Sequence, residues 1–173
     1  MNGLESLRID LKSLQEGLSV FENDLDSAFF EALGGQEVNG GRLHVSLSIR
    51  KASGFFDLTS RIEGSVVVAC DLCLEEMVLP IETENHIIVK YGSEDTMEDD
   101  VVTVAEDEGI LDMSWLVYEF ITLAIPIRHV HAPGKCNPVM AKVLEELSSD
   151  RSSDEESGGA MDSRWSELLK LKD

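Results

Sequence analysis

The alternation of apolar and polar residues over residues 43–50 decides the fold. This stretch is LHVSLSIR, in which every second side chain is apolar. A period of two is typical of a strand with one buried and one solvated face. The same spacing continues at 56–68, after a turn at 52–54, and a third run follows at 79–91. Three alternating runs joined by short turns predict an antiparallel β-meander over residues 41–91.

Shorter elements are expected before and after the meander. Residues 7–11 alternate between apolar and polar types and predict a first short strand. Residues 26–33 predict a short helix, because a glycine pair follows and is a common stop signal. The strongly acidic segment 92–112 contains valines at 101–104, which predict a short edge strand within a solvated loop.

Two helices are expected after this acidic segment. A broad apolar face over residues 113–124 predicts a helix that ends before Pro126, since proline cannot continue a helix. Asn137 and Pro138 have the residue types of a helix cap and a first helical position, which predicts a second helix to residue 147. We expect these helices to pack on the sheet or beside it. The side chains expected to face inward in the second helix are Val139, Val143, Leu144 and Leu147. The predicted class is therefore α+β, with a single domain over residues 1–147.

The composition changes after residue 147. Serine, aspartate, glutamate and glycine dominate residues 148–161, and such a segment buries too little apolar surface to order itself. We therefore expect a flexible acidic linker there, followed by a short amphipathic helix over residues 162–173. Arg164 and Trp165 of this helix are predicted to contact a partner. The alternative is that Trp165 folds back onto the domain.

The charge of the chain narrows the classes of partner. Fourteen Lys and Arg residues face 34 Asp and Glu residues, which gives a formal net charge of −20. Nucleic-acid binding usually needs a basic face that displaces counterions from phosphates, so direct nucleic-acid binding is not expected. Basic proteins are the natural electrostatic partners. Within the acidic segment, the predicted docking residues are Glu94, Asp95, Asp99 and Asp100, the alternative being an ordinary solvated face.

Cysteine usage and hydropathy predict the compartment. Three cysteines are too few for a disulfide framework and leave one unpaired in any scheme. The first residues, MNGLESLR, contain no apolar signal core. No stretch approaches the ~18 uncharged residues of a membrane span. We expect a cytoplasmic protein with no membrane association.

The sharpest local motif is a C-x-x-C at residues 70–73, where the second strand of the meander turns into the third. A hairpin tip can direct two thiolates toward one metal ion, as zinc ribbons do. One of the histidines His129 and His131, together with Cys136, could complete a Cys₃His set. We therefore predict a zinc site formed by Cys70, Cys73, His131 and Cys136.

Two other interpretations of these cysteines remain. In the first, Cys70 and Cys73 are only small, half-buried residues of a tight turn. In the second, they are redox-active, although the acidic residues Glu75 and Glu76 that follow disfavour the thiolate that such chemistry needs.

No enzymatic activity is expected. The chain has no Walker-type loop, no G-x-G-x-x-G and no H-E-x-x-H motif. A nucleophilic pair of Cys136 and His131 would lie in one short loop without visible oxyanion donors. No pair of carboxylates stands out on a rigid element.

Several segments together resemble the YceD-like family, also called the large ribosomal RNA subunit accumulation protein family. Residues 64–68 followed by Cys70-x-x-Cys73 are similar to its strand and C-x-x-C-L segment. Residues 123–126, with His131 and Cys136 after them, resemble its L-x-L-P…H…C segment. Residues 162–168 resemble its D-P-R-W-x-x-L signature. The departures are Leu72, where the family commonly has arginine, and Ser163 in place of the signature proline.

The resemblance implies a non-enzymatic role in the accumulation of large-subunit ribosomal RNA. Combined with the net charge, it leads us to expect contacts with a basic ribosomal protein or a large-subunit assembly factor. The alternative function is a metal- or redox-responsive regulator in which the Cys70–Cys73 turn is the working part.

Overall fold

The computed structural model describes most of the chain up to the end of its last helix. The described residues are 4–35, 37–93, 95–98 and 100–147. The predicted linker and C-terminal helix, with Arg164 and Trp165, lie outside this part of the chain, so their predictions stay untested. Within the described residues, no helix is long and apolar enough to cross a membrane.

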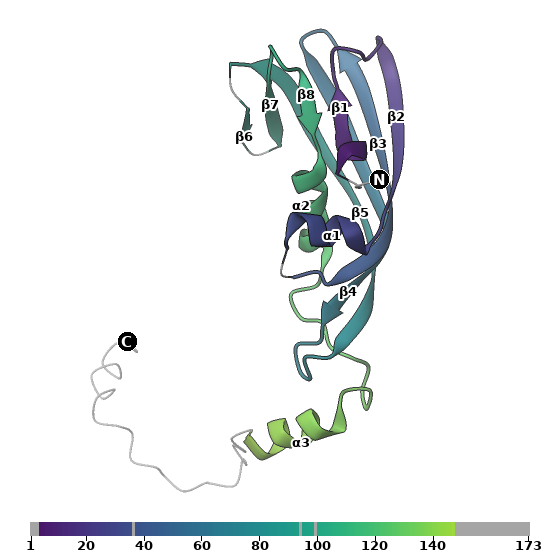
Figure 1. Cartoon of the computed structure of the whole chain (residues 1–173), viewed down its shortest axis with the longest axis vertical. Helices are drawn as coiled ribbons and strands as arrows, with labels where there is room; N and C mark the ends of the chain where they lie inside the picture. Colours follow the sequence, from purple (N-terminus) through teal and green to yellow (C-terminus); the bar gives the residue numbers. More distant parts are fainter. Residues whose placement is uncertain (1–3, 36, 94, 99, 148–173) are drawn as a thin grey trace, which may run out of the picture.

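The chain forms one large sheet, a two-stranded ribbon and helices, which confirms the predicted α+β class (Figure 1). The elements in chain order are a 3-10 turn η1 (Glu5–Leu7), β1 (Arg8–Asp10), β2 (Gly17–Leu25), α1 (Ser27–Leu33), β3 (Gly40–Ala52), β4 (Phe55–Ala69), β5 (Glu76–Gly92), β6 (Thr96–Glu98), β7 (Val101–Ala105), β8 (Ile110–Asp112), α2 (Ser114–Ala124) and α3 (Pro138–Leu147).

The predicted meander forms the centre of the large sheet, whose strand order is β2-β3-β4-β5-β7-β6. Strands β3, β4 and β5 pair antiparallel, with Val45 opposite Ile62 and Ile62 opposite Thr83. Strand β7 pairs parallel with β5 and antiparallel with β6. The valine strand was predicted at the edge of the sheet, and this was wrong, because β6 folds back and pairs with its free side.

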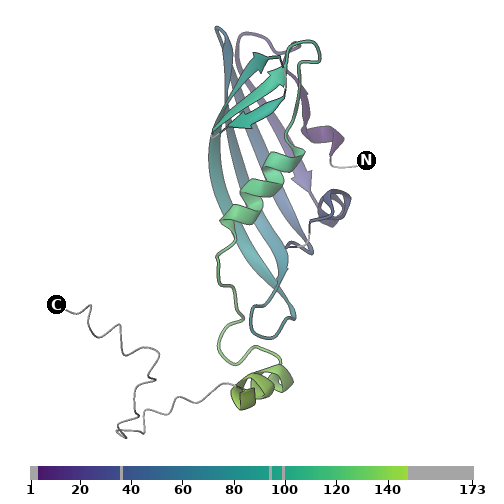
Figure 2. The ribbon, with the colours of Figure 1, turned by 90° about the vertical axis from the view of Figure 1, so that its left-hand side faces the viewer.

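The alternation along β3 to β5 buries one face of the sheet. The fully or nearly fully buried side chains of this face are Leu43, Val45, Leu47, Ile49, Phe56, Leu58, Ile62, Val66, Val68, Ile81, Ile87 and Val89. The helices α1 and α2 and the β1–β8 ribbon cover this face, and α2 crosses it diagonally (Figures 1 and 2). The polar side chains that alternate with these apolar residues face solvent, as the period of two predicts.

Strand β2 was not predicted, and its residues explain why. Ser19 and Asn23 lie opposite Ile49 and Val45 on the covered side of the sheet, whereas Leu18 and Val20 point to solvent. Neither face of this edge strand is uniformly apolar, so the period of two is obscured.

Helix α3 corrects a second expectation. Its four apolar side chains, Val139, Val143, Leu144 and Leu147, were expected to face inward, and all are exposed. The connection from Pro126 to Asn137 carries α3 past the end of the sheet, so α3 lies beyond the β4–β5 turn and not on the core (Figure 2). An apolar helical stripe therefore need not face its own domain.

A close approach of two backbones requires glycine at position 64. Gly64 has φ +145° and lies opposite Leu43, and an added Cβ would overlap the Arg42 carbonyl oxygen and lie 2.9 Å from the Leu43 Cα. We expect Gly64→Ala to lower the free energy of unfolding by about 2 kcal/mol, measured by urea denaturation. Gly54→Ala at the hairpin turn is the control, because its Cβ would meet nothing within 4 Å. An equal loss of unfolding free energy in both variants would contradict a steric clash at position 64 as its cause.

One ion pair on the solvent face predicts a pH effect. The ring Nδ1 of His44 lies 2.8 Å from Asp24 Oδ1, and this hydrogen bond raises the pKa of His44 above 6.5. The pair therefore stabilises the fold fully below about pH 6.5, and this contribution is lost as the pH rises through the raised pKa. We expect Asp24→Asn to return the His44 pKa toward 6.5 in an NMR titration, with Asp100→Asn as a neutral control. An unmoved titration midpoint in Asp24→Asn would refute this assignment.

Candidate metal centre

The turn between β4 and β5 is held in a fixed shape by its own backbone. The Cys70 N–H donates to the Glu75 carbonyl at 2.9 Å, and the Leu74 N–H donates to the Cys70 carbonyl at 2.9 Å. Leu74 has φ +60° and is the only non-glycine residue with a left-handed backbone among those described. Cys70 and Cys73 are both buried beneath this turn. The C-x-x-C therefore lies at the hairpin tip, as predicted.

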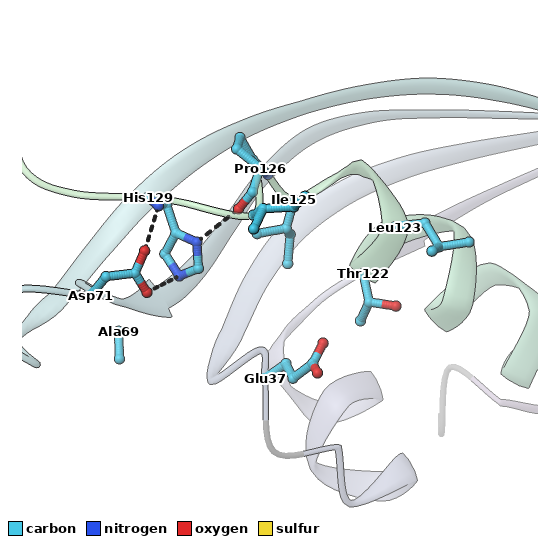
Figure 3. Close-up of a pocket in the computed structure, with 9 residues that line it drawn as sticks. Glu37, Ala69, Asp71, Thr122, Leu123, Ile125, Pro126 and His129 are labelled. Atoms are coloured by element: carbon cyan, nitrogen blue, oxygen red, sulfur yellow. Dashed lines mark hydrogen bonds and ion pairs between the residues drawn. The ribbon is translucent and has the colours of Figure 1, made fainter. Parts of the chain in front are cut away.

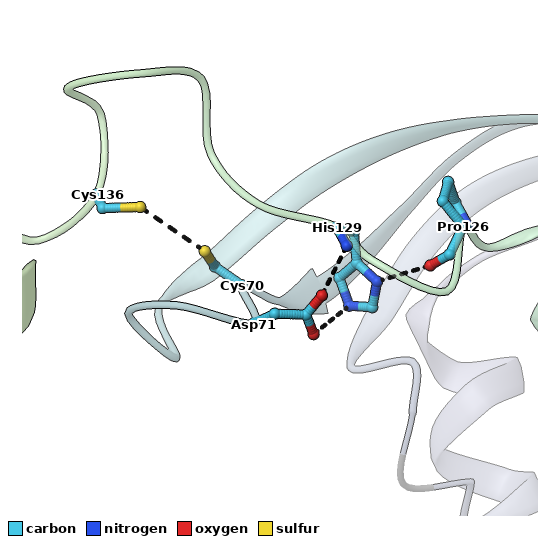
Figure 4. A network of polar contacts seen from close by, with 5 residues as sticks. All are labelled: Cys70, Asp71, Pro126, His129 and Cys136. Atoms are coloured by element: carbon cyan, nitrogen blue, oxygen red, sulfur yellow. Dashed lines mark hydrogen bonds and ion pairs between the residues drawn. The ribbon is translucent and has the colours of Figure 1, made fainter. Parts of the chain in front are cut away.

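Asp71 attaches a distant segment to this turn. The Asp71 N–H donates to the His129 carbonyl at 3.0 Å. The His129 N–H donates to Asp71 Oδ2 at 2.7 Å (Figure 4). The His129 ring also lies 3.6 Å from Asp71 Oδ1 and bonds the Pro126 carbonyl through Nδ1 at 3.0 Å. These contacts fix the backbone two residues before His131, so His131 faces the cysteines.

Asn137 positions the fourth residue of the group. Its amide Nδ2 donates to Glu75 Oε1 at 2.6 Å, which ties the start of α3 to the same turn. Its Oδ1 accepts from the Val139 N–H and caps α3, as the sequence predicted. Cys136 is thereby held next to Cys70.

The four predicted ligand residues converge on one point. Their ligand atoms all lie within 4.8 Å of one another. The Sγ atoms of Cys70 and Cys136 are 3.9 Å apart, and the His131 Nδ1 lies 3.3 Å from Cys73 Sγ and 3.9 Å from Cys136 Sγ. Ordinary Zn–S and Zn–N bonds in a tetrahedron place two sulfurs about 3.8 Å apart and a sulfur and a nitrogen about 3.6 Å apart. The cluster therefore has the size of a tetrahedral zinc site.

The local backbone also favours a thiolate. Burial raises the pKa of Cys70, but hydrogen bonds from the backbone N–H groups of Cys73, His131 and Leu72 outweigh it and lower the pKa to about 6. Hydrogen bonding to Cys70 raises the pKa of His131 against the effect of burial. Burial, together with the Cys70 and Cys73 sulfurs, raises the pKa of Cys136 to about 11. The acidic residues after the motif were expected to disfavour the thiolate, but the pKa of Cys70 is lowered, because of the hydrogen bonds from these backbone N–H groups.

Two of the predicted acidic docking residues, Asp95 and Asp100, are among the described residues, and they lie by β6 and β7 at the other end of the sheet. Asp95 accepts the Ala105 N–H at 2.6 Å, and the Asp100 carbonyl accepts the Ile88 N–H at 2.8 Å. Glu94 and Asp99 fall outside the described residues. Asp95 and Asp100 thus hold β6 and β7 in place, and a docking role for these residues stays a prediction.

Sequence reasoning missed the Asp71–His129 contact. Its signal in the sequence is weak, because an aspartate inside a C-x-x-C turn and a histidine two residues before a ligand are common surface residues. Only the folded connection from Pro126 to Asn137 brings them within bonding distance.

The comparisons with known proteins agree with the landmarks of the sequence. A family model described as the large ribosomal RNA subunit accumulation protein YceD matches residues 58–172. This range covers most of the chain and contains all four residues of the cluster. No curated protein and no solved structure matches the chain. The chain belongs to the YceD family of large ribosomal RNA subunit accumulation proteins.

Proposed function

We propose that this protein is a non-enzymatic factor of large ribosomal subunit biogenesis that acts through contacts with basic proteins in the cytoplasm. Its partner would be a basic ribosomal protein or a large-subunit assembly factor. The observation that carries this proposal is the family match over residues 58–172, since the family is named for the accumulation of large-subunit ribosomal RNA.

The charge of the chain supports protein contacts over RNA contacts. A net charge of −20 repels phosphate at long range and attracts basic proteins. A free ribosomal protein is rich in Lys and Arg and would otherwise bind nucleic acid without selectivity. An acidic factor can shield or deliver such a protein without binding the RNA itself.

The Cys70, Cys73, His131 and Cys136 cluster would hold a structural zinc ion within this factor. Four protein ligands fill the tetrahedron, whereas catalytic zinc sites keep one position open for water or substrate. A closed site fits a protein without enzymatic activity. Its role would be to join the β4–β5 turn to the segment that leads into α3.

A binding experiment with purified components tests the proposal. The full chain is titrated with individual basic proteins of the large subunit and, separately, with fragments of large-subunit ribosomal RNA. We expect at least one ribosomal protein to bind this chain in near-physiological salt. The same ribosomal protein should bind more weakly to an unrelated protein whose net charge is similar to that of this chain. Tight binding of the RNA fragments, with poor binding of every basic ribosomal protein, would refute the proposal.

A thiol-based regulator is the second candidate, and the lowered pKa of Cys70 favours it. The Cys136 sulfur lies 3.9 Å from that of Cys70, within reach of a disulfide after a small movement. The zinc content and the thiol state of protein purified without chelators distinguish the structural zinc site from the thiol-based regulator. One zinc ion per chain supports the structural site, and a metal-free protein whose cysteines form a reversible disulfide supports the regulator.

A further inference from the structure

A groove lies next to the candidate metal centre, between the end of α2 and the end of β4. It has a volume of about 520 Å³, within the ~300–1,000 Å³ typical of ligand pockets. Leu123 lines it from the last turn of α2, and Ile125 and Ile127 line it from the segment after that helix. Glu37 and Asp71 line it from the α1–β3 connection and the β4–β5 turn (Figure 3).

The apolar side of this groove is unusually exposed. The side chain of Leu123 is 81% exposed and that of Ile127 is fully exposed. Leu123 lies on the solvent side of the last turn of α2, and Ile127 follows Pro126, after which the chain leaves the helix, so neither side chain enters the core. Large apolar side chains gathered on one exposed patch commonly mark an interaction site.

The remaining side of the groove carries negative charge. Glu37 is exposed and forms no hydrogen bond or ion pair with any other described residue, so its carboxylate is available to a ligand. Asp71 adds a second carboxylate that the His129 N–H already holds in place. Among the described residues, no Lys or Arg lines the groove. A ligand would therefore meet an apolar wall and, opposite it, two carboxylates.

We propose that this groove binds an extended peptide segment of a basic protein, in which an apolar side chain is followed closely by Lys or Arg. The apolar side chain packs on Leu123, Ile125 and Ile127, and the cation pairs with Glu37. Charge selects this occupant, because a second copy of the chain or a nucleic acid would bring further negative charge to the groove. This inference rests on the proposed function and assigns the contact with basic proteins to a defined surface.

Binding to short peptides tests the groove. The probes are overlapping peptides that cover the basic proteins of the large subunit, and the peptide bound most tightly is labelled for fluorescence anisotropy. The groove variants are Leu123→Ser, Ile127→Ser and Glu37→Lys. The matched controls are Leu18→Ser, an exposed leucine on β2, and Glu84→Lys, which changes the net charge of the chain as much as Glu37→Lys does.

We expect each groove variant to weaken peptide binding about tenfold or more, which corresponds to about 1.4 kcal/mol, and each control to bind like the wild type. All five positions are exposed, so loss of folding does not explain a difference. Equal weakening by Glu37→Lys and Glu84→Lys would mean that net charge alone attracts the peptide. This result would overturn the assignment of the groove as the peptide-binding site.

The outcomes separate the groove from the proposed function. If the wild type binds intact basic ribosomal proteins and the groove variants bind them equally well, the groove assignment fails and the function stands. If the wild type binds no basic ribosomal protein, the function itself fails. Tighter binding of a synthetic peptide of residues 162–173 than of any ribosomal peptide would identify this chain's own C-terminal segment as the occupant and overturn the inference.

Discussion

Replacing Cys136 with serine is expected to abolish the binding of one zinc ion per chain. A neutral hydroxyl is a poor zinc ligand, and structural zinc in small domains contributes about 10–16 kcal/mol of apparent binding free energy through its full ligand set. Even outer-shell changes weaken metal binding about 10–100-fold, so loss of a direct ligand should exceed about a hundredfold. Zinc content of protein purified without chelators, followed by competition with a chromophoric chelator, measures this effect.

The same variant has a structural consequence. Cys136 is the last ligand before α3, so its loss should loosen the loop between His131 and Asn137, while the Asp71–His129 and Glu75–Asn137 contacts still hold the two ends of that loop to the β4–β5 turn. Limited proteolysis should then cut this segment faster than in the wild type. Ala132→Ser is the matched control, because it adds a serine to the same loop and keeps all four ligands. Retention of one zinc ion per chain by Cys136→Ser, or a wild type without zinc, would contradict the site.

Ile62→Ala is expected to lower the free energy of unfolding by about 2–5 kcal/mol, as truncation of a large buried aliphatic side chain does. Ile62 is fully buried at the middle of β4, between Val45 on β3 and Thr83 on β5. Its loss would leave a cavity in the centre of the sheet, where neighbouring strands cannot close in. Urea denaturation measures the change.

The control for this variant is Val20→Ala on β2, whose side chain is 53% exposed. Its stability should change by less than about 0.5 kcal/mol, because surface substitutions away from special features have small effects. Similar losses in the two variants would mean that the core does not lie on the face assigned to it.

The meander could be predicted because its signal is local. The alternation at residues 43–50 places the same parity inward in the structure, from Leu43 to Ile49. The parallel pairing of β5 with β7 was out of reach, since it depends on how β6 folds back through the acidic segment. Pairings between distant segments leave no periodic pattern in either strand.

The metal centre was predictable from residue chemistry, although its assembly was not. Cysteine and histidine are the side chains that zinc prefers, so the chain itself limits the ligand set to a few residues. The contact of Asp71 with His129 decides which histidine turns toward the sulfurs, and no spacing rule contains that information. The direction of α3 was equally hidden, because its apolar stripe predicts burial and the connection before it prevents that burial.

Affinity capture from a native cell extract, with and without ribonuclease, tests the role in ribosome biogenesis most directly. The tagged full-length chain is the bait, and mass spectrometry identifies the captured proteins. We expect basic proteins or assembly factors of the large subunit to remain bound after ribonuclease treatment, because an acidic chain contacts them without RNA. Loss of all large-subunit proteins on ribonuclease treatment would contradict a function through protein contacts.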